Sequence, residues 1–253
     1  MRNLPHSFIP AVVAAHRDVL RAFYAMPKLV GIVAFIIVAQ ALLDVIVVNR
    51  LIPRESLFGR DIVLIVQEFL ITPFLIAVHR FIILGEVTPN YVLQPYSARF
   101  QMFFGWQVVV LVATRISEPL ILMLGKKNPV GYPIVAFILI AVVVAVTRMT
   151  ILFPAIAVDA PGTTLRNAIR DTKGHGWYIF FLFLFSCVPI VVVAIVAASI
   201  SLRLFGAVAG RVLILLVTGA AVVALLAIAV AIASRLYLAL GEDVNRPAAS
   251  APS

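Results

Sequence analysis

Four ionisable residues fall inside long apolar runs, where a charge is costly and is a candidate for function. They are Asp44, Glu68, Arg115 and Glu118. If the N-terminus lies on the inner side, the three carboxylates share the outer third of the membrane, and Arg115 stands one helical turn from Glu118. Such a cluster could hold a cation, a proton or a small polar solute. It could instead only fix how helices pack, which we favour because water reaches this depth and no matching cluster occurs in the later apolar runs.

A second candidate is the largest polar connection between two apolar runs, residues 163–176. Thr163 or Thr164 is suited to cap a short helix, and Gly174 to end it. One face is apolar and the other basic: Leu165, Ala168, Ile169 and Thr172 against Arg166, Asn167, Arg170 and Lys173. A short helix of this kind is typical of a segment that lies flat on an anionic membrane surface. We therefore expect Arg166, Arg170 and Lys173 to contact lipid.

The composition is that of an integral membrane protein. Hydrophobic residues make up 63% of the chain and charged residues 12%, against about 45 to 50% and 25% in soluble domains. The formal charge of +9 does not indicate nucleic acid, because the basic residues are spread over short connections that anchor membrane helices. The single cysteine, Cys187, lies in an apolar run and excludes both an intramolecular disulfide and a cysteine metal cluster.

No arrangement of residues indicates catalysis. The histidines are dispersed, and none has a partner at metal-ligand spacing. Ser186 and Ser201 lack the His and Asp neighbours that nucleophilic catalysis needs. His79 is better suited to snorkel or to bond a neighbouring helix than to act as a base. We expect no catalytic residue, metal or cofactor, and no enzyme.

The hydrophobic pattern predicts an all-α, polytopic membrane protein. Residues 1–28 read as an interfacial amphipathic helix, residues 29–240 as a six-helix transmembrane domain, and residues 241–253 as a disordered cytoplasmic tail rich in Ala, Pro and Ser. Each span needs about 20 apolar residues. The runs that provide them are approximately 29–48, 62–84, 101–124, 132–153, 177–201 and 212–238.

The second, fourth and sixth apolar runs share a pattern near their ends. It reads AVHRFIILGE from Ala77, AVTRMTILFP from Ala145 and IASRLYLALGE from Ile232. This similarity predicts three tandem helical hairpins, each preceded by a surface helix: residues 8–28, 91–100 and 163–176. Arginine is also common at the cytoplasmic ends of spans, where its stem snorkels, but that does not explain why LGE occurs twice.

The stretches HRFIILGE at 79–86, RMTILFPAIAVD at 148–159 and TLRNAIRDTKGHGW at 164–177 carry a resemblance. On these residues the chain resembles six-span bacterial inner-membrane proteins, namely the YciC-like family and the membrane domain found ahead of some glycerophosphodiester phosphodiesterases. The resemblance implies a fold and the bacterial inner membrane. It implies no settled activity, and the phosphodiesterase domain is absent from this sequence.

Small residues form a narrow stripe in the last apolar run, which lets helix backbones approach closely. The stripe consists of Ala220, Ala224, Ala227 and Ala231. It could pack within its hairpin or form a homodimer.

Taken together, these features favour a non-enzymatic inner-membrane protein that binds membrane lipids or partner membrane proteins. The alternative is a small channel or transporter for a cation or a small polar solute. An intramembrane enzyme acting on lipid has the weakest support, because no paired catalytic groups converge.

The charge distribution predicts the topology. With both termini in the cytoplasm, the inner segments carry 12 Lys and Arg residues and the outer loops 7, the bias that bacterial membrane proteins show. Reporter fusions after Lys126 and after Lys173 should therefore read outside and inside, respectively. The reverse pattern would invert the orientation and move the carboxylates to the cytoplasmic third.

Overall fold

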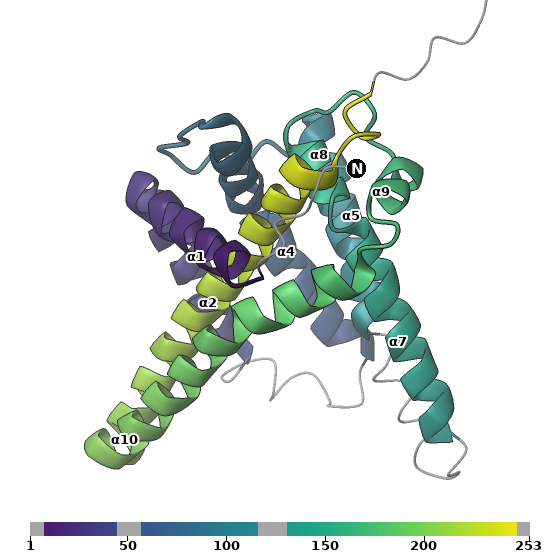
Figure 1. Cartoon of the computed structure of the whole chain (residues 1–253). Helices are drawn as coiled ribbons and strands as arrows, with labels where there is room; N and C mark the ends of the chain where they lie inside the picture. The colour runs from purple at the N-terminus through teal and green to yellow at the C-terminus, as the bar shows by residue number, and fades with distance from the viewer. Residues whose placement is uncertain (1–7, 45–56, 116–130, 247–253) are drawn as a thin grey trace, which may run out of the picture.

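The computed structural model describes residues 8–44, 57–115 and 131–246, and every regular element in these ranges is a helix (Figure 1). This confirms the all-α class. The helices are α1 (Phe8–Ala25), α2 (Pro27–Leu43), α4 (Leu57–Leu84), α5 (Ala98–Arg115), α7 (Gly131–Met149), α8 (Leu152–Ala157), α9 (Leu165–Asp171) and α10 (Gly176–Leu240).

Four helical stretches are long and apolar enough to cross a membrane. They are Asp61–Leu84, Tyr132–Ala157, Gly176–Gly206 and Ala209–Leu240. A fifth span is possible if α1 and α2, which meet at a 100° bend, cross as one unit. Helix α5 is not among these stretches, and the end of the expected run 101–124 lies outside the described residues. The length and composition of these helices are those of a multi-pass helical membrane protein, and six spans remain a prediction.

Helix α10 is a hairpin made of two of these spans. Gly206, between them, has a φ of 70°, a left-handed conformation that glycine adopts without steric cost. Figure 1 shows the two arms running down from the rest of the molecule and meeting at this turn, while α7 descends separately. Most residues of α7 and of the first arm are exposed although they are apolar, as expected of surfaces that face lipid.

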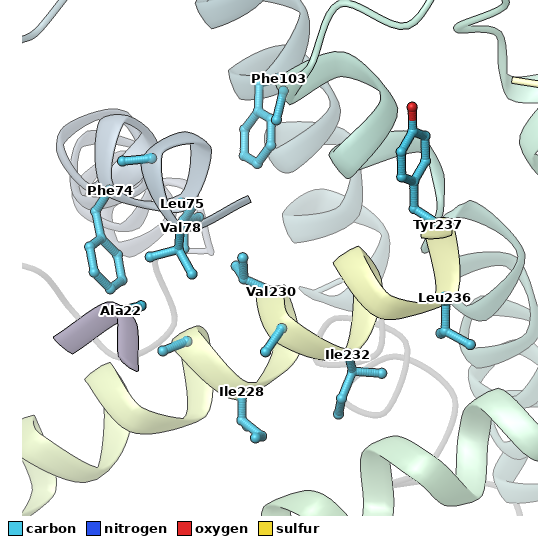
Figure 2. Close-up of a cluster of buried hydrophobic side chains, with 14 of the residues drawn as sticks. Ala22, Phe74, Leu75, Val78, Phe103, Ile228, Val230, Ile232, Leu236 and Tyr237 are labelled. Atoms are coloured by element: carbon cyan, nitrogen blue, oxygen red, sulfur yellow. The ribbon is translucent and has the colours of Figure 1, made fainter. Parts of the chain in front are cut away.

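The hydrophobic core lies where the second arm of α10 crosses α1, α2 and α4. Phe74 of α4 and Ala22 of α1 are completely buried, as are Ile228 and Ile232 of α10 (Figure 2). Small side chains in α1 let it approach α10 closely. Asp18 of α1 is buried there as well, and it accepts a hydrogen bond from Arg235 Nε at 2.6 Å.

This packing uses the inner half of the alanine stripe. Ala227 and Ala231 are fully buried in the core, whereas Ala224 is half-buried and Ala220 exposed. The molecule's own helices therefore cover Ala227 and Ala231, and a homodimer through the stripe stays a prediction.

The prediction of a surface helix over residues 91–100 is wrong. The chain has no helix from Gly85 until α5 begins at Ala98. Pro95 gives a physical reason, since proline has no N–H to donate and disfavours helical geometry in the residue before it. The Tyr91 hydroxyl instead donates to the carbonyl of Leu70 at 2.8 Å.

Ion pairs join the connections at this end of α4. Arg80 donates through Nε and Nη2 to the two carboxylate oxygens of Glu86, both at 2.7 Å, and through Nη1 to the carbonyl of Ala157 at 3.0 Å. Arg99 of α5 pairs with Asp159, which follows α8. These bonds tie α4 and α5 to the turn after α8.

The repeat pattern has a structural counterpart. His79 and Ser234 hold the same place in it, one residue before the late arginine, and the structure joins them by a buried hydrogen bond of 2.8 Å between Nδ1 and Oγ. This confirms that His79 bonds a neighbouring helix. Equivalent positions of the pattern in two apolar runs thus meet in a buried contact, and duplication itself stays a prediction.

Replacing Ser234 with alanine should destabilise the protein by about 1–3 kcal/mol, because a buried ring nitrogen of His79 loses its partner. Thermal unfolding in detergent measures the effect. Ser199→Ala is the matched control, since that hydroxyl is exposed and bonds only within its own helix, to the carbonyl of Ile195. Equal melting temperatures for both variants would contradict a structural role for the His79 bond.

Candidate functional site

The predicted intramembrane cluster is divided between two smaller groups. In the first, the Gln107 amide of α5 donates to Glu68 Oε2 of α4 at 2.7 Å, and the Thr72 hydroxyl donates to Gln107 Oε1 at 2.7 Å. This chain of polar groups is a side-chain link between α4 and α5 within the bundle. Gln107 and Thr72 are buried, so the link holds the Glu68 carboxylate in place.

The second group pairs Arg115 with Asp61, whose Oδ1 lies 3.5 Å from Nε. Among the described residues, no ion pair joins Asp44 or Glu68 to Arg115. Asp44 stands at the end of α2, and Glu118 lies outside the described residues. The sequence prediction missed Asp61 because it falls one residue before the apolar run that begins at residue 62.

The short helix predicted between the fourth and fifth apolar runs is present as α9. The Thr164 hydroxyl accepts the backbone N–H of Asn167 at 3.2 Å, which confirms Thr164 as the N-cap. Gly174 has a φ of +86° in the turn that follows, as expected of a helix stop. On the predicted apolar face, Ala168 and Thr172 are buried and Leu165 partly buried, while Ile169 remains 43% exposed.

The chain directly after α10 holds α9 in place. Residues 241–246, named here the C-terminal clasp, fold back onto α9, and Val244 is fully buried. Asp171 accepts the backbone N–H groups of Asp243 and Val244 at 3.0 and 3.1 Å. The prediction of a disordered tail is therefore wrong for residues 241–246, because the N–H groups of Asp243 and Val244 bond the Asp171 carboxylate.

Gly162 makes room for the clasp. Its N–H donates to the carbonyl of Val244 at 2.9 Å. A Cβ at this position would lie 2.4 Å from the carbonyl oxygen of Asp243 and 2.6 Å from that of Arg246. No side chain fits so close to backbone oxygens, and the contact requires glycine.

The clasp uses only part of the basic face of α9. Arg170 pairs with Asp243, and Asn167 donates to the carbonyl of Gly162 at 2.8 Å rather than facing water. Arg166 and Lys173 are exposed, and neither side chain bonds any other residue that the structure describes. Of the three predicted lipid contacts, two are thus available and one is engaged within the protein.

The pKa values of two carboxyl groups where the clasp meets α9 shift in opposite directions. The Arg170 guanidinium lowers the pKa of Asp243 below its ordinary value, whereas burial raises the pKa of Asp171 above its own. On acidification Asp171 is therefore the first of the two to take up a proton.

Arg148 connects α7 to α9. Its Nη1 donates to the carbonyl of Thr172, and the Thr172 hydroxyl lies 3.1 Å from the carbonyl oxygen of Arg148. This double link and the clasp fix α9 from two sides. The basic face of α9 is consequently presented in one orientation.

Asp171→Ala should release the clasp, because two backbone N–H groups lose their shared acceptor. We expect hydrogen exchange at residues 243 and 244 to become at least about tenfold faster, since 1.4 kcal/mol corresponds to a factor of ten. The control is Glu242→Ala, in the same segment, because Glu242 approaches only Arg246 at 4.0 Å. Unchanged exchange in Asp171→Ala would show that the clasp does not depend on this carboxylate.

Comparison with known proteins gives this geometry no precedent. Neither a family model, nor a curated protein, nor a solved structure matches the chain. Among the described residues, no group of three or more His, Cys, Asp and Glu side chains is arranged to hold a metal ion. The function is therefore proposed from the arrangement of charge and apolar surface.

Proposed function

We propose that this protein binds anionic lipid at the membrane surface and acts without catalysis. The observation that carries the proposal is the state of the basic face of α9. Arg166 and Lys173 are exposed and bond no described residue, beside an Arg170 that is already paired. Each basic side chain near an anionic surface contributes about 1 kcal/mol to binding.

The surroundings of α9 support this proposal. Ile169 is 43% exposed and Trp177 is 77% exposed, and tryptophan favours the headgroup level of a bilayer. Because the clasp and Arg148 already hold α9, its backbone needs no further ordering when its basic side chains meet a surface. The arrangement suits a preformed contact with lipid headgroups.

The same proposal includes the orientation. We infer that α9 and both termini lie on the cytoplasmic side of a bacterial inner membrane, because Lys and Arg are more frequent in those segments. The cytoplasmic leaflet carries anionic lipid, which matches the charge of Arg166 and Lys173.

A second candidate function is favoured by Glu68. Its carboxylate is held inside a predicted span by the Gln107 amide at 2.7 Å, and acids at membrane depth often mark ion or proton paths. A channel or transporter for a cation or a small polar solute would use this group. Basic surface residues contribute nothing to such a path, which separates the two functions experimentally.

The test is a fluorescent label at position 169 in the full chain, with Cys187→Ala to remove the only native thiol. In anionic vesicles the label should report shallow lipid contact, and Arg166→Gln with Lys173→Gln should weaken that contact more in anionic than in neutral lipid. Arg203→Gln, in the turn region of α10, is the matched control. Equal water exposure in both lipids would refute surface binding, and cation flux abolished by Glu68→Gln would favour the second function.

A further inference from the structure

An apolar groove of about 530 Å³ lies between α7 and the start of α10. This volume is within the range of small-molecule sites, about 300–1,000 Å³. Its walls are bulky aliphatic and aromatic side chains: Leu139, Ile140, Val143 and Val144 from α7, and Trp177 and Phe180 from α10. Ile140, Val143 and Thr147 recur at helical spacing, so they line one face of α7.

A single charged residue, Arg148, lines one end of this groove. Its Nη1 bonds the carbonyl of Thr172, and no carboxylate of the described chain forms an ion pair with it. Arginine has five N–H donors, so most remain for a ligand. Gly176 adjoins the guanidinium, since a Cβ there would be in ordinary van der Waals contact with Nη2, at 3.7 Å.

The groove has the depth of one membrane leaflet. From Leu139 to Arg148 the helix rises about 14 Å at 1.5 Å per residue, close to half of a hydrocarbon core of about 30 Å. A lipid whose headgroup lies at Arg148 would therefore place its chain along the groove. Trp177 and the exposed Lys173 are at the same end as the guanidinium, near the expected headgroup level.

We propose that this groove binds one acyl chain of an anionic glycerophospholipid, with the phosphate at Arg148. The inference rests on the proposed lipid-binding function and names its ligand class. Phosphate matches the planar guanidinium, which can donate two parallel hydrogen bonds to it. The apolar walls match the chain, since each buried methylene contributes to binding.

An apolar helix of a second copy fits this groove less well. Helices in lipid associate through small residues that let backbones approach, whereas these walls carry Leu, Ile, Val, Trp and Phe. A second helix would also leave Arg148 facing an apolar surface without an anion. Charge and shape both favour a lipid.

Native mass spectrometry of the full chain in mild detergent, with phosphatidylglycerol or phosphatidylcholine added, tests the proposal. The parent should retain one lipid and prefer phosphatidylglycerol by about tenfold, the order expected of a charge-assisted pair. Val143→Trp fills the groove and should abolish the adduct with either lipid. Val193→Trp is the control, because Val193 is exposed on α10 outside the groove.

Arg148→Gln should remove the preference between the two lipids while the single adduct remains, and Arg148→Lys should retain part of it. Equal binding of both lipids by the parent, or an adduct unaffected by Val143→Trp, would overturn the proposal. A dimer that Val143→Trp disrupts would overturn it too and identify a second copy as the occupant. A charge-dependent signal at position 169 without any adduct would reject the groove alone, whereas an adduct without that signal would reject surface binding by α9.

Discussion

A guanidinium near the end of an apolar helix must find oxygen partners, and three such groups organise this molecule. Arg80 bonds Glu86 and the carbonyl of Ala157, Arg148 bonds the carbonyl of Thr172, and Arg235 bonds Asp18. Glu86 lies in the connection after α4 and Thr172 caps α9, whereas Ala157 ends α8 and Asp18 lies in α1. Arg80, Arg148 and Arg235 therefore fix the positions of the polar segments that pack against the bundle. Arg148 differs from the other two because its partner among the described residues is a neutral carbonyl, which leaves its charge available.

The three related segments have diverged around this common constraint. Gly85 of the first LGE has a φ of +73°, and the glutamate after it returns to Arg80. Gly241 of the second has a φ of −71° and leads into the C-terminal clasp. The bond between His79 and Ser234 joins equivalent positions of two segments. The residues that follow each segment differ in structure: Glu86 pairs with Arg80, whereas residues 241–246 form the clasp. The similar sequence therefore does not give these segments the same turn geometry.

Features that depend on local geometry could be predicted from the sequence. The Thr164 cap, the Gly174 stop and the long apolar helices each follow from residues within one or two turns. The clasp could not be predicted, because an Ala- and Pro-rich tail reads as disordered and nothing local shows that Asp243 meets Asp171, 72 residues earlier. An ion pair at Arg115 was predicted, but with other carboxylates. Its partner among the described residues is Asp61, at the edge of an apolar run, and Glu68 instead bonds the Gln107 amide. Pro95 indicates that residues 91–100 do not form a helix. The prediction of a helix there followed the repeat pattern instead.

The position of the clasp also bears on how the protein is made. Helix α9 leaves the ribosome before α10, whereas the residues that hold it follow the 65 residues of that helix. Until residues 243 and 244 have been made, Asp171 lacks the N–H groups that it accepts, and Gly162 lacks the carbonyl to which its N–H donates. Closure of the clasp is therefore a late step of biogenesis that reports successful insertion of the last hairpin. A chain whose last hairpin fails to insert would keep α9 loosely held and open to the proteases that survey the membrane surface.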